Sequence, residues 1–184
     1  MQHRSGVKTR PLLSLYLQRA RIAAAKPWLQ GRVLDVGSSD GALARLIPGD
    51  KYVGFEPEPG VKARARATFP SHTFVDALPS DRFDTVVALA VVEHLTEPAD
   101  TVSSWVECVR PGGRLVLTTP HKAFRWAHES GAKIGLSCAD AADDHETLFS
   151  RETLLHCLRE LPISLEVYRR FLFGMNQLFV FRRS

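Results

Sequence analysis

The chain has 184 residues, 45% of them hydrophobic, and a formal net charge of +4 at pH 7. This length suits one buried core, so we expect a single domain over residues 1–184. The three cysteines are widely spaced, which argues against a disulfide framework or a thiolate zinc site. Without an apolar run of about 20 residues or a secretory signal pattern, we expect a cytoplasmic protein.

The N-terminal segment, residues 1–30, is basic. The first 34 residues hold seven Lys or Arg and no Asp or Glu. Leucines at helical spacing predict a basic amphipathic helix over residues 11–26. Such a helix suits an acidic substrate, peripheral contact with a membrane surface or a transit peptide, and it could equally pack its leucine face on the domain. Basic and aromatic residues do not alternate densely, so we do not expect nucleic acid as a partner.

Strand-like and helix-like stretches then alternate along the chain. The predicted strands cover residues 32–36, 52–56, 72–75, 83–89 and 113–119. The predicted helices cover residues 41–46, 60–69 and 99–109. This alternation is typical of a doubly wound α/β fold, a mostly parallel sheet with helices on both faces.

The pattern changes after Ser150. A predicted helix over residues 151–160 leads to two β-rich runs, 164–173 and 177–182, which are joined by Gly174-Met175-Asn176. A short turn of this kind predicts an antiparallel C-terminal hairpin. The expected sheet has seven strands and is mixed at one edge.

The stretch VLDVGSSDG places two glycines, Gly37 and Gly41, directly after the first predicted strand. A glycine turn at the carboxyl end of a parallel strand lets the backbone approach a nucleotide closely. The GxGxxG pattern of a pyrophosphate site is absent, which argues against a nicotinamide oxidoreductase. Asp35, just before the turn, would repel a pyrophosphate and attract a positively charged cofactor.

Two further acids follow the next two predicted strands. Glu56 comes about 20 residues after the glycine turn, where doubly wound folds bind a ribose diol. Asp76 could accept a hydrogen bond from an exocyclic amine of adenine. A single acid of this kind is commonly a loop residue or a helix N-cap, but three in register indicate one binding site.

These motifs resemble the class I S-adenosylmethionine-dependent methyltransferases, in particular the branch that acts on small molecules. The resemblance rests on VLDVGSSDG, YVGFEP, FVDALP, FDTVVALAVVEHL, VRPGGRLVLTTP and DHETLFSRETL. It implies S-adenosylmethionine as the cofactor. By resemblance, the methionine end would be bound by Asp35, Gly37, Ser39 and Gly41, the ribose by Glu56, and the adenine by Asp76 and the Ala77 backbone. Ser39 stands where the family commonly has glycine, and its Cβ restricts the backbone there.

The implied reaction moves a methyl group to an O or N atom of a small acceptor. Because the sulfonium is already activated, alignment supplies much of the acceleration. A histidine could remove the acceptor's proton, and the candidates in order are His145, His121 and His94. Residues 121–148 hold basic and aromatic side chains suited to a substrate lid over an acidic or lipid-like acceptor.

Two alternatives stay open at this stage. Glu93, His94 and His145 partly resemble the metal site of RNA 3′-end 2′-O-methyltransferases, but Ala90 occupies the position of the first glutamate. A non-catalytic protein that only binds the cofactor would have nearly the same motifs. The oligomeric state is not indicated by the sequence.

Overall fold

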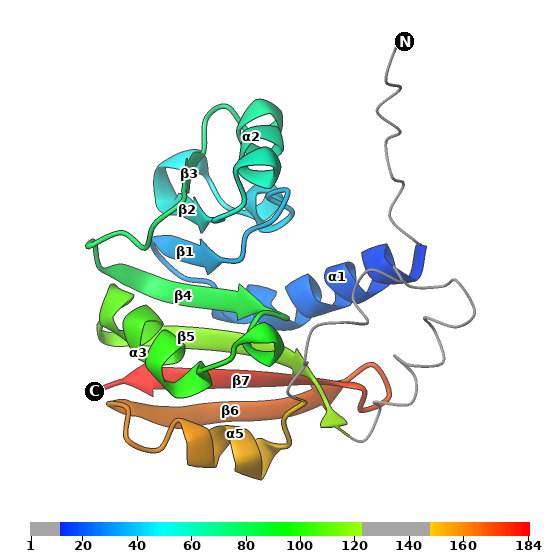
Figure 1. The fold of residues 1–184 in the computed structure, drawn as a ribbon, viewed down its shortest axis with the longest axis vertical. Helices are drawn as coiled ribbons and strands as arrows, with labels where there is room; N and C mark the ends of the chain where they lie inside the picture. The colour runs from blue at the N-terminus through cyan, green and yellow to red at the C-terminus, as the bar shows by residue number, and fades with distance from the viewer. Residues whose placement is uncertain (1–11, 123–147) are drawn as a thin grey trace.

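The computed structural model describes residues 12–122 and 148–184, and its centre is a seven-stranded sheet in the order β3-β2-β1-β4-β5-β7-β6 (Figure 1). The strands are β1 (Val33–Val36), β2 (Tyr52–Phe55), β3 (Thr73–Val75), β4 (Phe83–Leu89), β5 (Val109–Pro120), β6 (Ile163–Phe171) and β7 (Asn176–Arg183). The α-helices are α1 (Leu12–Ala25), α2 (Pro59–Thr68), α3 (Pro98–Cys108) and α5 (Arg151–Cys157). Short 3-10 helices are η1 (Lys26–Trp28), η2 (Leu43–Leu46), η3 (Gly49–Lys51) and η4 (Val92–His94).

Strand pairing confirms the predicted fold class. Strands β1 to β5 are parallel, whereas β7 runs antiparallel to both β5 and β6. The chain reverses its direction of winding between β1 and β4, which are neighbours in the sheet. In open α/β sheets the ligand crevice lies at this point, beyond the carboxyl ends of the strands.

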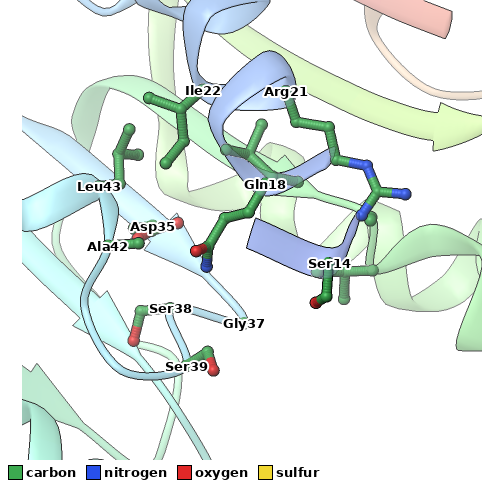
Figure 2. A pocket seen from close by; sticks show the side chains of 13 residues that line it. Ser14, Gln18, Arg21, Ile22, Asp35, Gly37, Ser38, Ser39, Ala42 and Leu43 are labelled. Atoms are coloured by element: carbon green, nitrogen blue, oxygen red, sulfur yellow. The ribbon is translucent and has the colours of Figure 1, made fainter. Parts of the chain in front are cut away.

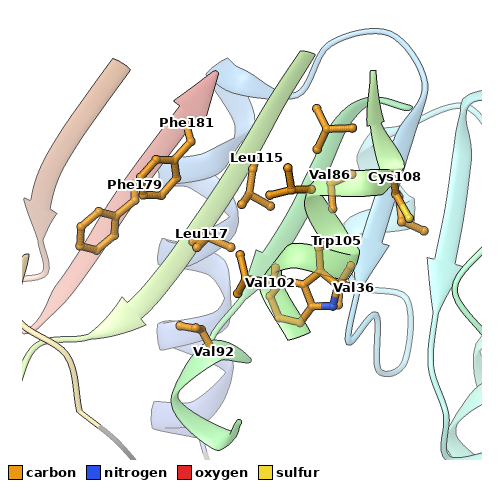
Figure 3. Packing of buried hydrophobic residues seen from close by; sticks show 14 of the residues in the cluster. Val36, Val86, Val92, Val102, Trp105, Cys108, Leu115, Leu117, Phe179 and Phe181 are labelled. Carbon is orange, nitrogen blue, oxygen red and sulfur yellow. The ribbon is translucent and has the colours of Figure 1, made fainter. Parts of the chain in front are cut away.

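Each face of the sheet has its own hydrophobic core. Leu115 and Leu117 of β5 belong to the core that α3 and α5 cover, whereas Val116 between them belongs to the core that α1 and α2 cover. This alternation follows from the two-residue period of a strand. Trp105 of α3 is fully buried on the first face, where it packs with β-strand side chains (Figure 3). Helices on both faces agree with the sequence prediction.

The helix predicted at residues 41–46 is wrong, because the chain forms only the 3-10 helix η2 there. Pro48 explains the difference. Proline disfavours a helical conformation in the residue before it, and Ile47 is extended, with φ −125° and ψ 132°. The connection between β1 and β2 therefore contains only the 3-10 helices η2 and η3.

Most other elements differ from their predicted bounds by one residue at an end, and the larger differences are in β5, β6 and α5, which ends at Cys157 rather than at residue 160. Strand β5 begins at Val109 rather than at residue 113, because the chain pairs with β4 before and after an irregularity at Gly112, where φ is +71°. Strand β6 ends at Phe171, since Leu172 and Phe173 take up left-handed conformations with φ of +52° and +54°. The predicted antiparallel hairpin is nevertheless present.

Helix α1 forms close to the predicted bounds and lies across β4, β5 and β7 (Figure 1). Ala24 and Ala25 are buried at its C-terminal end, while Leu13 and Tyr16 are exposed. Among the residues that the structure describes, none of the helices combines the length and the apolar character that a bilayer span requires. Most of the predicted lid, residues 121–148, lies outside the described residues.

Candidate functional site

The turn after β1 is held open by glycine. Gly37 and Gly41 have φ values of +68° and +77°, a region that side chains with a Cβ rarely occupy. A Cβ added at Gly37 would lie 2.7 Å from Cγ2 of Val91. The backbone N–H groups of Gly37 and Ser38 both donate to the carbonyl of Phe55, at 3.0 Å each. These bonds attach the turn to the end of β2.

Ser39 takes a left-handed conformation, with φ of +50°, despite its Cβ. The turn therefore keeps the conformation that a glycine would have, at a cost of about 1–2 kcal/mol. Its backbone N–H donates to Oε2 of Glu56 at 3.0 Å. The residue by which this chain departs from the family pattern is thus connected directly to the predicted ribose ligand.

Glu56 follows β2 and is buried, with 9% of its surface exposed. Its Oε1 accepts the backbone N–H of Glu58 at 3.0 Å, while its Oε2 accepts that of Ser39. One backbone donor on each oxygen fixes the carboxylate and leaves other lone pairs available. This arrangement can receive two hydroxyl donors from a ligand.

Asp35 at the end of β1 is buried and accepts a hydrogen bond from the Tyr52 hydroxyl at 2.7 Å. Burial raises the pKa of Asp35 to about 7; the bond from Tyr52 opposes the rise and the charge of Glu56 adds to it. A carboxyl group with this pKa gains or loses its proton near neutral pH. A cation beside it would favour the charged form.

A cavity of about 340 Å³ lies between α1 and the glycine turn (Figure 2). Asp35, Gly37 and Ser39 line one side, and Ser14, Gln18, Arg21 and Ile22 of α1 line the other. Leu89 at the end of β4, with Ala90 and Val91 after it, forms a further part of the wall. The cavity thus brings together predicted residues of β1 and the glycine turn with the N-terminal helix, for which the sequence left several roles open.

Arg21 is a site residue that sequence reasoning did not identify. Its Nε donates to Oδ1 of Asn176 at 2.9 Å, which joins α1 to the start of β7. Glu93, in η4, is buried as well, and its pKa is raised by burial, with Arg21 and His94 acting against the rise. Within the described residues, Oε2 of Glu93 makes no hydrogen bond of standard geometry, although the Thr119 hydroxyl is near enough to lower its pKa. Arg21 lines the cavity, and the buried carboxyl group of Glu93, which does not line it, is close enough to feel the charge of Arg21.

The predicted adenine ligands lie apart from this cavity. Asp76 forms an ion pair with Lys62 of α2, which holds the pKa of the Asp76 carboxyl below its usual range. The Asp76 side chain is 68% exposed, and Ala77 is exposed too. Neither residue lines the cavity, nor do Gly41 and Glu56. Glu56 is linked to the cavity by its hydrogen bond from Ser39 and by the effect of its charge on Asp35.

The three predicted histidines fall in different places. His94 is exposed at the end of η4, and His121 is partly buried after β5. Partial burial, with Arg170 and Lys122 nearby, lowers the pKa of His121, so its imidazole is neutral at pH 7 and able to accept a proton. Neither side chain lines the cavity. His145 lies outside the described residues.

The partial metal motif cannot be assembled here, since it includes His145. Over residues 12–122 and 148–184, no group of three or more His, Cys, Asp or Glu side chains is arranged to hold a metal ion. Glu93 and His94 are neighbours in η4, but one is buried and the other is exposed.

Comparison with known proteins gives the same family as the motifs. Residues 9–161 match the family described as "Methyltransferase domain". A "Ubiquinone biosynthesis O-methyltransferase" from Bradyrhizobium sp. (strain ORS 278) is 28% identical over 136 residues, which are 64% of this chain and 54% of the relative. The chain spans about half the length of curated relatives that it matches.

Solved structures share the fold. An S-adenosylmethionine-dependent methyltransferase from Mesorhizobium loti superposes with a TM-score of 0.73 at 18% identity, over 91% of this chain and 100% of that one. Magnesium protoporphyrin IX methyltransferase from Synechocystis PCC 6803, with bound S-adenosylhomocysteine, gives 0.70 at 16% identity, over 97% and 90%. The glycine turn, the acids after β1 and β2 and the sheet order fit this cofactor type. The chain therefore belongs to the methyltransferase domain family, that of the class I S-adenosylmethionine-dependent methyltransferases.

Proposed function

We propose that this chain transfers a methyl group from S-adenosylmethionine to an oxygen atom of a small acceptor. The observation that carries the proposal is the cavity beside the glycine turn, which has Asp35 buried in its wall and Glu56 fixed next to it. Oxygen is preferred to nitrogen because relatives are named O-methyltransferases. The other named relatives and structures support the cofactor.

In this proposal each residue of the turn has a separate role. The carboxylate of Asp35 and the backbone of Gly37 and Ser39 face the methionine end of the cofactor, and Glu56 accepts the ribose hydroxyls. The cofactor supplies an activated methyl group when bound. The chain's own contribution is to exclude water from the cavity and to align the acceptor, which is where much of the acceleration in such displacements arises.

Proton removal from the acceptor is assigned to a histidine. His121 is neutral at pH 7 because its pKa is lowered, which suits a general base. His145 and His94 stay candidates for the same role. Asp76 and Ala77 stay our candidates for the adenine, with Asp76 sharing its carboxylate between Lys62 and the ligand.

The acceptor is proposed to be acidic or lipid-like. Arg21 places a guanidinium in the cavity wall, where it would attract an anionic acceptor. The exposed Leu13 and Tyr16 of α1 would suit contact with a membrane surface from which a lipid-like acceptor is taken. A methylation screen with acidic phenols and with quinol-like lipids in vesicles separates these two acceptor classes.

Calorimetry with S-adenosylmethionine and S-adenosylhomocysteine tests cofactor binding. Glu56→Gln is expected to weaken both by at least about tenfold, because the amide is a poorer acceptor and loses one backbone bond. Glu58→Gln, two residues later, is the matched control and should bind like the parent. Equal binding by the Glu56 variant would refute the ribose assignment, and binding without turnover on any acceptor would indicate a cofactor-binding protein rather than an enzyme.

A further inference from the structure

A second cavity, of about 290 Å³, lies at the opposite end of the sheet from the cavity beside the glycine turn. It is lined by residues just before β1 and at the start of β4, together with the start of β5 and the end of β7. These positions are the amino ends of the parallel strands, where the family's cofactor does not bind. The two cavities share no lining residue.

Arginines dominate this cavity. Arg114 of β5 and Arg182 of β7 are directly opposite each other in the antiparallel ladder. Like charges at such positions are destabilising. Glu166 of β6 lies between them, 2.8 Å from Nε of Arg114 and 3.3 Å from Nη1 of Arg182, and the two arginines lower its pKa. One carboxylate therefore serves two guanidinium groups.

A third arginine completes the cluster. Arg110 forms an ion pair with Asp84, whose Oδ2 also accepts the backbone N–H of Arg32 at 2.6 Å. Three guanidinium groups thus meet two carboxylates. Arg110 and Arg182 are 60% and 45% exposed, so they can turn toward a ligand. Within the described residues, the guanidinium of Arg182 donates one hydrogen bond, to Glu166, although a guanidinium has five donors.

Glycine keeps the floor of the cavity open. Gly112 has a φ of +71°, and a Cβ added there would meet only Nη2 of Arg182, at 3.8 Å. At Gly31 an added Cβ would lie 2.1 Å from Oδ2 of Asp84. The space beside Gly112 is therefore open, whereas the Asp84 side chain occupies the space beside Gly31.

We propose that this second cavity binds a phosphate-type oxyanion, with Arg110, Arg114 and Arg182 as its ligands. Guanidinium groups bind such anions through paired hydrogen bonds, and an anion between Arg114 and Arg182 would also relieve their mutual repulsion. The volume of about 290 Å³ has room for more than one phosphate group. Because the two cavities are separate, this binding is independent of the proposed methyl transfer.

Calorimetry with inorganic pyrophosphate at constant ionic strength tests the site. Arg182→Gln is expected to weaken pyrophosphate binding by about tenfold or more. Arg64→Gln, which removes the same charge from the exposed surface of α2 near the other edge of the sheet, is the matched control. Both variants should bind S-adenosylmethionine like the parent. Equal loss of pyrophosphate affinity in the two variants would overturn the site in favour of nonspecific charge.

The phosphate group could be that of a soluble molecule or of a lipid. Sedimentation with vesicles of phosphatidylcholine and phosphatidic acid provides the second arm. Pyrophosphate binding that depends on Arg182 supports a soluble ligand, and vesicle binding that depends on Arg182 supports a lipid. If the parent binds neither pyrophosphate nor the vesicles, the proposal is wrong.

Discussion

The two ends of the central sheet hold their charged side chains in different ways. At the carboxyl ends of β1 and β2, the acids Asp35 and Glu56 are buried and held by a hydroxyl and by backbone N–H groups. At the amino end of β5 and the end of β7, arginines that are exposed or partly exposed share two carboxylates. The first end is prepared for a cation and the second for an anion. Burying the acids at the first end lowers the stability of the fold and makes that stability depend on pH. The charges at the second end are more exposed, so they affect stability less and are screened by salt.

The largest effect is expected at Asp35. Its folded pKa of about 7 lies above its ordinary value of 3.8, so between these values the folded protein holds a proton that the unfolded chain has released. The ligand-free protein should therefore lose stability as the pH rises from about 4 through about 7, by on the order of 2–4 kcal/mol. Asp35→Asn removes this loss, and urea unfolding across that pH range should show the variant more stable than the parent above about pH 7.

Asp50→Asn, at an exposed position, is the control and should follow the parent at every pH. Calorimetry adds the functional readout. A cation beside Asp35 favours its charged form, so S-adenosylmethionine should bind the parent more tightly as the pH rises through about 7, and the Asn variant should lack this slope. Identical slopes in the two proteins would place the cofactor away from Asp35.

The second prediction concerns the glycine turn. Gly37→Ala adds a Cβ at positive φ and within 2.7 Å of Val91, so we expect a loss of roughly 2 kcal/mol of stability and much weaker cofactor binding. Gly60→Ala in α2 is the matched control. Its added Cβ would meet only the ends of the flexible Glu58 and Arg64 side chains, and the helix should be about 0.5–1 kcal/mol more stable. Thermal unfolding and calorimetry measure both effects.

The third prediction concerns the connection between α1 and the sheet. Arg21→Gln removes the donor to Asn176 and a positive charge that acts on the buried Glu93, so we expect a loss of about 1 kcal/mol of stability. Amides of α1 should exchange their hydrogens faster. Arg19→Gln on the exposed side of the same helix should change neither stability nor exchange. Equal exchange in both variants would show that Arg21 does not hold α1 over the cavity.

The sequence was sufficient to predict the sheet, but not the residues of α1 that line the cavity beside the glycine turn. Strand β4 was predicted at its observed bounds because an apolar run buried on both faces has few other interpretations. The residues of α1 that line the cavity, such as Gln18 and Arg21, could not be predicted, because they depend on the angle at which the helix crosses the sheet. Likewise, the pair of Lys62 and Asp76 arises from packing between α2 and β3, which no local pattern reveals.

The smallest effect on stability is expected at the amino ends of the parallel strands, in contrast to the large effect at Asp35 at their carboxyl ends. Glu166→Gln leaves Arg114 and Arg182 opposite each other without their shared carboxylate. Because these groups are partly exposed, stability should fall by less than about 1 kcal/mol, and added salt should reduce the loss. The same change makes the cavity more positive, so pyrophosphate should bind a few times more tightly.

Glu160→Gln, which removes a carboxylate from the exposed pair with Arg159, is the matched control for net charge. It should leave pyrophosphate affinity unchanged, and neither substitution should alter the affinity for S-adenosylmethionine. If Glu166→Gln weakens pyrophosphate binding, Glu166 holds the arginines in their binding geometry rather than competing with the anion, and the charge argument for this end of the sheet is wrong. A stability loss at Glu166 as large as that at Gly37 would likewise show that exposure does not make this end tolerant of change.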